Sequence, residues 1–191
     1  MDRNFVAIVS GLPRSGTSMM MRMIDAGGIP ALIDNTRKPD EDNPRGYYEF
    51  EAVKRTKQDP SWLAQAGGKV VKMVHLLLLD LPKDRGYRVI FMRRRLEEVV
   101  KSQNVMLERK GKSSQGLRDD QVMNMFRQQI QQVDQYLKSS PCFKVLYVNY
   151  NELLGDPRPW LSTLDEFLGG EMQTDKMLEM VDPSLYRQRA S

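Results

Sequence analysis

Cysteine and histidine are almost missing from this chain of 191 residues, which has only Cys142 and His75. A single cysteine excludes an internal disulfide and fits a reducing cytoplasm, where we expect the protein to work. One histidine and one cysteine do not form a metal-ligand cluster, so we predict no metal. No apolar run approaches the roughly 20 residues that span a membrane, and the block 5–9 is too short for a secretory signal. We therefore predict a cytoplasmic protein without a membrane span.

Charge of one sign is not in large excess either. The net charge of +4 suits an anionic nucleotide as well as a nucleic acid. The one arginine triplet, Arg93–Arg95, is weak support for a nucleic-acid surface, and we predict no nucleic-acid partner. With 40% hydrophobic and 28% charged residues, the chain has the composition of a globular protein. Its length suffices for one α/β domain, which we expect to span residues 1–191.

Short apolar blocks alternate with helical or loop sequence along the chain. The blocks 4–9, 69–74, 87–92 and 143–148 are typical of buried strands, and residues 122–137 have the three- to four-residue apolar spacing of an amphipathic helix. Such alternation predicts a parallel sheet. We expect an α/β fold with a P-loop-like parallel sheet of about four to five strands, flanked by helices on both faces.

The segment Gly11-Leu12-Pro13-Arg14-Ser15-Gly16-Thr17-Ser18 has the spacing of a phosphate-binding loop. It lies between a predicted strand and a predicted helix, so its backbone N–H groups are expected to point at an anion. Thr17 stands where ATP- and GTP-binding loops have the lysine that reaches the β- and γ-phosphates. The only cation in the loop is Arg14. An ordinary nucleoside triphosphatase is therefore disfavoured, whereas a phosphate or sulfate site is not.

The stretch Pro13–Thr17 resembles the loop with which sulfotransferases hold the 5′-phosphosulfate of 3′-phosphoadenosine 5′-phosphosulfate (PAPS). A second element, residues 89–102, is similar to the family's 3′-phosphate element, in which a strand ends in arginine and a serine follows eight positions later. Arg94 and Ser102 have that spacing. Residues 145–169 resemble the late strand and helix of many sulfotransferases, so the resemblance covers about residues 5–169.

This resemblance implies a PAPS-dependent sulfotransferase that releases 3′-phosphoadenosine 5′-phosphate (PAP). It implies that Arg94 and Ser102 bind the 3′-phosphate, while Arg14 stabilises charge on the sulfuryl group. We also expect Lys72 to reach the donor's sulfate. The residues expected at the 5′-end of the donor are Gly11, Pro13, Arg14, Ser15, Gly16, Thr17 and Ser18.

Transfer to a hydroxyl also requires a base, for which the chain offers two candidates. Glu49 lies downstream of the loop, as does the glutamate of carbohydrate and tyrosylprotein sulfotransferases, and we rank it first. His75 lies three positions after Lys72, whereas cytosolic sulfotransferases separate lysine and histidine by two, and the run Leu76–Leu79 beside it also fits a packed, structural histidine. Glu51, two residues from Glu49, stays open as well.

Two other functions compete with this interpretation: a P-loop kinase or phosphotransferase that uses ATP, and a nucleotide-binding protein without catalysis. The acceptor is expected to be a small molecule or glycan with a hydroxyl or amine. We expect residues 34–68 and 104–120 to shape its pocket.

Overall fold

A single sheet of four parallel strands forms the centre of the computed structural model, which describes residues 5–34, 36–40, 43, 45–109, 111 and 116–182. The strands are β1 (Val6–Gly11), β2 (Val70–Val74), β3 (Tyr87–Arg93) and β4 (Phe143–Asn149). Their order in the sheet is β2-β1-β3-β4, and every neighbouring pair is parallel. The predicted α/β class with a parallel sheet is confirmed.

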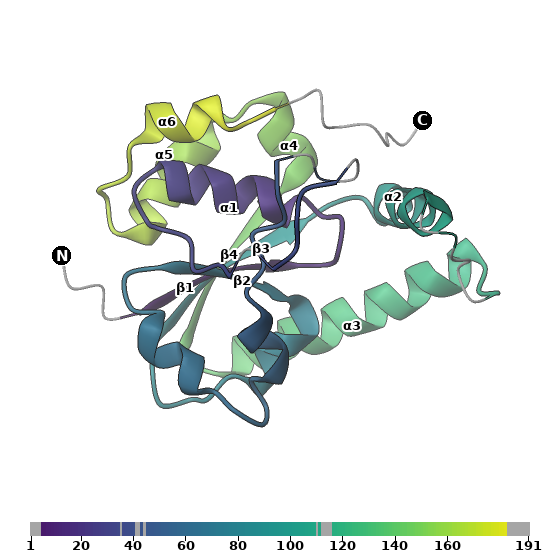
Figure 1. Ribbon diagram of the computed structural model, residues 1–191, viewed down its shortest axis with the longest axis horizontal. Coiled ribbons are helices and arrows are strands. Elements are labelled where there is room, and N and C mark those ends of the chain that lie inside the picture. The colour runs from purple at the N-terminus through teal and green to yellow at the C-terminus, as the bar shows by residue number, and fades with distance from the viewer. Residues whose placement is uncertain are drawn as a thin grey trace.

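Helices cover both faces of the sheet (Figure 1). Because neighbouring residues of a strand point to opposite faces, Val9 joins one buried cluster and Ile8 the other. The face of Val9 is covered by α1 (Thr17–Ala26), α4 (Tyr150–Gly155), α5 (Arg158–Leu168) and α6 (Thr174–Glu179). The face of Ile8 is covered by α3 (Asp119–Ser139) and by three short 3₁₀ helices, η1 (Glu51–Arg55), η2 (Ser61–Gln65) and η3 (His75–Asp80). Strands buried on both faces explain the continuous apolar blocks in the sequence.

The remaining helix, α2 (Leu96–Arg109), follows the carboxyl end of β3 and packs on the first part of α3. Val99 and Val100 of α2 meet Val122 and Phe126 of α3 in a third, smaller buried cluster, which also includes Leu12. This cluster anchors α2 beside the segment that follows β1, and so it holds the two predicted anion-binding elements at one end of the sheet.

The strand order creates a crevice at the carboxyl end of the sheet. From β1 the chain passes to β2 on one side, whereas β3 leads to β4 on the other side. Ligands of open α/β sheets bind at such a reversal, outside the carboxyl ends of the two strands. Here Gly11 at the end of β1 pairs in register with Met92 near the end of β3. The glycine-bounded loop and Arg94 therefore leave the sheet side by side.

Candidate functional site

The loop after β1 has a backbone path that its two glycines make possible. Gly11 has a φ of +148°, and a Cβ at this position would lie 2.6 Å from Ser15 Oγ and 2.7 Å from the Met92 carbonyl oxygen. Gly16 has a φ of +94°, and its Cβ would lie 2.3 Å from the ring of Tyr150. All three distances are shorter than real Cβ contacts, and both φ values are unfavourable for other residues. The glycines therefore allow the loop to fold tightly against β3 and α4.

The loop ends at the N-terminus of α1, for which Gly16 is the N-cap without any side-chain cap. The first backbone hydrogen bond of the helix runs from Met20 N to the Gly16 carbonyl, so the N–H groups before Met20 are not used within the helix. Together with the helix dipole they form a site for an anion. Thr17 and Ser18 both line the pocket at this point.

The hydroxyl of Ser15 is not placed to contact a ligand in the pocket. It is buried and donates to the Leu12 carbonyl at 2.7 Å, and Ser15 N donates to the same oxygen at 3.2 Å. The side chain thus closes the turn of the loop and does not line the pocket. Gly11, Pro13, Arg14 and Gly16 do line it, as do Thr17 and Ser18.

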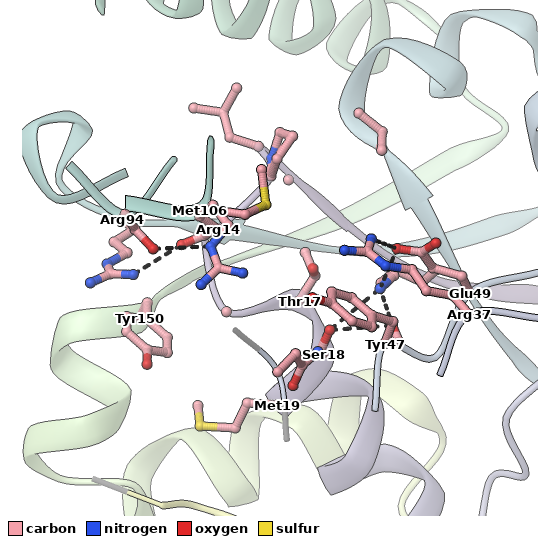
Figure 2. Close-up of a pocket in the computed structure, with 18 of the residues that line it drawn as sticks. Arg14, Thr17, Ser18, Met19, Arg37, Tyr47, Glu49, Arg94, Met106 and Tyr150 are labelled. Atoms are coloured by element: carbon pink, nitrogen blue, oxygen red, sulfur yellow. Dashed lines mark hydrogen bonds and ion pairs between the residues drawn. The ribbon is translucent and has the colours of Figure 1, made fainter. Parts of the chain in front are cut away.

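Arg14, Arg94 and Ser102 meet at one end of the pocket, although the sequence separates Arg14 and Ser102 by 88 positions. Arg14 Nε donates to Ser102 Oγ at 3.0 Å, and Arg94 Nη1 donates to the Arg14 carbonyl at 3.0 Å. The Arg94 guanidinium also lies 4.9 Å from the centre of the Tyr150 ring. Figure 2 shows Arg14 and Arg94 together, with Tyr150 below them and Met106 above Arg14. Arg94 and Ser102, the predicted ligands of the 3′-phosphate, therefore form one cluster with Arg14 of the loop.

A buried carboxylate fixes the orientation of Arg94. Glu98 Oε2 accepts from Arg94 Nε at 2.8 Å, and the side chains of the two residues are 0% and 7% exposed. Asn151 Nδ2 donates to both carboxylate oxygens of Glu98 at 3.1 Å. A guanidinium whose Nε is held in this way presents its Nη groups in a fixed direction, as recognition of a phosphate requires.

A second polar cluster, centred on Glu49, lies at the other end of the pocket (Figure 2). Glu49 Oε1 accepts from Arg37 Nη1 at 2.9 Å and lies 3.7 Å from Lys72 Nζ. Lys72 also donates to the Tyr47 carbonyl, and its Nζ lies 3.4 Å from Ser18 Oγ. The Arg37 guanidinium stacks on the Tyr47 ring, 3.2 Å from its centre. Among the described residues, no hydrogen bond or ion pair involves Glu49 Oε2.

Burial shifts the acid–base chemistry of this second cluster. Lys72 is largely buried, and desolvation lowers the pKa of its ammonium to about 8, with the Glu49 carboxylate opposing part of that shift. At neutral pH the lysine is still mostly protonated, and it loses its charge in mildly alkaline solution. Lys72 therefore supplies a titratable cation next to a carboxylate.

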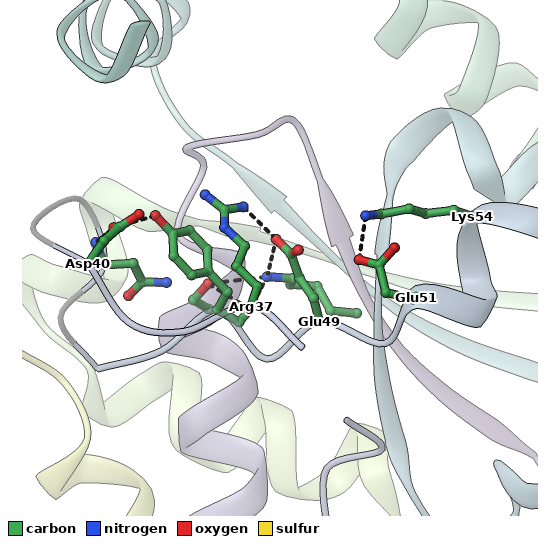
Figure 3. Close-up of polar contacts among 9 residues, drawn as sticks. Arg37, Asp40, Glu49, Glu51 and Lys54 are labelled. Carbon is green, nitrogen blue, oxygen red and sulfur yellow. Dashed lines mark hydrogen bonds and ion pairs between the residues drawn. The ribbon is translucent and has the colours of Figure 1, made fainter. Parts of the chain in front are cut away.

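His75 and Glu51, the other two candidates for a base, do not line the pocket. His75 is buried at the start of η3, where its Nε2 lies 3.0 Å from Gln129 Oε1 of α3, and desolvation lowers the pKa of its imidazole. Glu51 pairs with Lys54, and Figure 3 shows this pair pointing away from the contact between Arg37 and Glu49. Of the three candidates, the structure brings only Glu49 to the lining of the pocket.

Arg22 is a residue of the pocket that the sequence analysis did not single out. It lies on α1 and is only 5% exposed, and its buried Nε and Nη1 have no hydrogen-bond partner among the residues that the structure describes. Desolvation and the nearby Arg45 lower the pKa of its guanidinium. The sequence does contain a signal for this position. Arg22 follows Ser18 by four residues and Met19 by three, so it lies on the same face of the helix as these two residues of the pocket.

The N-terminus of α1, the cluster of Arg14, Arg94 and Ser102, and the cluster centred on Glu49 share one pocket of about 420 Å³ at the carboxyl end of the sheet. Glu49 is the one acidic side chain among the described residues of its lining. The cationic residues that line it are Arg14, Arg22, Arg37, Lys72, Arg94 and Arg109. Such a lining suits a ligand with several negative charges. Within the part of the chain that the structure describes, no group of His, Cys, Asp and Glu side chains is placed to hold a metal ion.

Comparison with known proteins gives the class of enzyme. A family model described as "Sulfotransferase domain" matches residues 6–188, which is nearly the whole chain. The chain belongs to the sulfotransferase domain family. The predicted family and the predicted enzyme class, a sulfotransferase, are thereby confirmed.

Solved structures of sulfotransferase domains have the same fold. The sulfotransferase domain of the olefin synthase of Synechococcus PCC 7002 matches with a TM-score of 0.60 and 14% identity, over 100% of this chain and 90% of that one. The sulfotransferase domain from the curacin biosynthetic pathway matches with a TM-score of 0.56 and 14% identity, over 95% and 79% of the two chains. A sulfotransferase from Alicyclobacillus acidocaldarius matches with a TM-score of 0.51 and 14% identity, over 91% and 83%. None of the curated proteins compared with this sulfotransferase matches it significantly.

The helices of the described residues are all too short or too polar to cross a membrane. Of the segment 104–120, which we expect to shape the acceptor pocket, residues 110 and 112–115 lie outside the described residues. Val105, Met106 and Arg109 from this segment line the pocket.

Proposed function

We propose that this sulfotransferase takes the sulfuryl group from PAPS and transfers it to a hydroxyl or an amine of a small-molecule or glycan acceptor. The observation that carries the proposal is the meeting of two anion sites in one pocket. One is the loop with the N-terminus of α1, and the other is the cluster of Arg14, Arg94 and Ser102. A nucleotide with phosphates at both its 5′- and 3′-positions is the kind of ligand that such a pair of sites fits.

In this proposal each end of the donor has its own set of groups. The N–H groups of Thr17 and Ser18 bind the 5′-phosphosulfate, and the Arg94 guanidinium and the Ser102 hydroxyl bind the 3′-phosphate. Arg14 belongs to the loop by its backbone but contacts Ser102 by its side chain, so it lies between the two phosphates. PAPS, when bound, supplies an activated sulfuryl group whose leaving group is PAP.

The Glu49 cluster supplies the chemistry at the transfer end. As the acceptor oxygen forms its bond to sulfur and the bond from sulfur to the 5′-phosphate oxygen breaks, Glu49 Oε2 takes the acceptor proton. Arg37 and Lys72 hold Oε1 and thereby orient the carboxylate. The Lys72 ammonium also reaches the N-terminus of α1 through Ser18, where it stabilises negative charge on the leaving phosphate.

The role of Glu49 can be tested by substitution with matched controls. We expect Glu49→Gln to lower kcat for acceptor sulfation at least about 100-fold, which is within the range that a positioned base contributes. PAP affinity should stay within a few-fold of wild type. Glu51→Gln and His75→Gln should retain kcat, because neither side chain lines the pocket. A Glu49→Gln enzyme with nearly normal kcat would overturn this assignment of the base.

The donor can be tested separately from the base by measuring PAP binding.

The cytoplasmic location inferred from the single cysteine stays a prediction, which fractionation of the source cells can check.

A further inference from the structure

Four apolar side chains of the pocket are not used by the core of the protein. Pro13, Val74, Val105 and Met106 line the pocket, and none belongs to, or packs against, the three buried clusters among the described residues. Val74 is 44% exposed, which makes it one of the few large apolar side chains with that much exposure. Apolar surface that the fold leaves in contact with water at a binding site commonly marks where a ligand buries its own apolar surface.

The position of Val74 places this surface beside the proposed base. Val74 ends β2 and pairs in register with Gly11, the first residue of the loop. Because side chains two apart on a strand share a face, Val74 stands on the same side of the sheet as Lys72, one step further toward the open edge. Lys72 Nζ in turn lies 3.7 Å from Glu49 Oε1. Val74 and Glu49 therefore line the same pocket, with Lys72 between them in the chain of contacts.

The other side of this surface comes from α2. Ser102, Val105, Met106 and Arg109 all line the pocket, and their spacing of three, four and seven places them along one face of the helix. Ser102 contacts Arg14, so Val105 and Met106 follow one turn beyond the proposed 3′-phosphate site. Met106 lines the same pocket as Arg14 and is labelled near it in the view of Figure 2. The apolar turn of α2 thus borders the donor site.

The two cations at the transfer end are already engaged within the protein. Arg37 and Lys72 are both held on Glu49 Oε1, and Lys72 is further held by the Tyr47 carbonyl. The four apolar residues offer no side-chain hydrogen bond. A sugar bound against them would leave hydroxyls without partners, which costs free energy. An anionic acceptor would meet both the Glu49 carboxylate and the negative donor.

We propose that the acceptor is an uncharged alcohol or phenol with an apolar body, and that Pro13, Val74, Val105 and Met106 bind this body. The proposal rests on the proposed function, because it takes the hydroxyl to be the group presented to Glu49. It narrows the acceptor from any small molecule or glycan to one chemical class.

Direct binding of a probe tests this proposal without requiring turnover. 2-Naphthol is titrated into the enzyme saturated with PAP, and into the free enzyme, with its own fluorescence as the readout; glucose is titrated by calorimetry for comparison. The variants are Val74→Ser and Met106→Ser, and the control is Met125→Ser, which changes a methionine that is 39% exposed on α3 and does not line the pocket. PAP affinity is measured for each protein in parallel.

We expect 2-naphthol to bind the PAP complex at least about tenfold more tightly than glucose, because its rings bury apolar area. Val74→Ser and Met106→Ser should each weaken the binding of 2-naphthol by about fivefold or more, and Met125→Ser should leave it unchanged. PAP affinity should be the same in all four proteins. Equal binding of glucose and 2-naphthol, or naphthol binding that neither variant weakens, would overturn the proposed acceptor class while leaving the donor proposal intact. Failure of the wild-type enzyme to bind PAP would instead refute the donor proposal, and the naphthol titrations of the free enzyme would still decide whether the apolar surface binds this probe.

Discussion

Replacing Glu98 by glutamine is expected to destabilise the protein far more than the same change at its neighbour Glu97. Both residues lie in the first turn of α2, where a negative charge interacts favourably with the helix dipole. Glu97 is exposed, whereas the side chain of Glu98 is fully buried against Arg94 and Asn151. Glu97→Gln therefore removes only the helix-dipole interaction and serves as the matched control.

The magnitude follows from what Glu98→Gln leaves behind. The Arg94 guanidinium, 7% exposed, loses the carboxylate that its Nε contacts at 2.8 Å. Removing one partner of a buried ion pair costs about 3–5 kcal/mol, and we take the lower end because glutamine can still accept one hydrogen bond. For a domain of this size, about 3 kcal/mol lowers Tm by roughly 6–12 °C. Glu97→Gln should cost less than about 1 kcal/mol.

Urea unfolding followed by circular dichroism at pH 7 gives the two free energies of unfolding, and thermal unfolding gives the two Tm values. Equal stability of Glu98→Gln and Glu97→Gln would refute the reasoning. It would mean that the buried carboxylate contributes nothing to holding Arg94.

Three further predictions concern other parts of the pocket. Because Lys72 in the free enzyme has a pKa of about 8, kcat/KM for the donor should fall as the pH rises through about 8. Lys72→Arg should remove this fall between about pH 7 and 9. An identical fall in the variant would exclude Lys72 as its cause. Gly16→Ala should lower the free energy of unfolding, measured in urea, by at least about 2 kcal/mol, because the residue has a left-handed φ of +94° and its Cβ would clash with Tyr150. Gly155→Ala, whose Cβ would meet nothing within 4 Å, should cost far less. Equal costs would contradict the strain at Gly16. Arg22→Met should raise the free energy of unfolding of the ligand-free protein by about 1–3 kcal/mol, since it removes two buried nitrogens that have no partner within the described part of the chain. A loss of stability would show that the guanidinium is satisfied in solution.

The sheet could be predicted because its strands are buried on both faces. Each strand is then a short apolar block, and each predicted block lies within two residues of the observed strand bounds. The helix predicted over 122–137 is longer, from Asp119 to Ser139. Its polar first turn carries no apolar period, but it is stabilised where Arg118 N donates to Gln121 Oε1 at 2.9 Å.

The loop could be anticipated from its spacing and Arg94 from the resemblance to sulfotransferases, whereas the contacts that support them could not. Asn151 lies 53 positions from Glu98, and only the pairing of β3 with β4 brings the two together. The role of Arg37 was equally hidden, because it stands in a polar loop without a period. His75 follows Lys72 closely in sequence, yet the turn from β2 into η3 directs it to Gln129 in α3 rather than into the pocket.

Calorimetric titration of the protein with PAP and with adenosine 5′-phosphate is the most direct test of the central claim, that this pocket binds a nucleotide by both its phosphates. We expect a micromolar Kd for PAP and binding of adenosine 5′-phosphate that is weaker by about 30-fold or more, because a charge-assisted contact to the 3′-phosphate is worth roughly 2–3 kcal/mol. Equal affinity for the two nucleotides, or tighter binding of ATP with magnesium than of PAP, would contradict this claim.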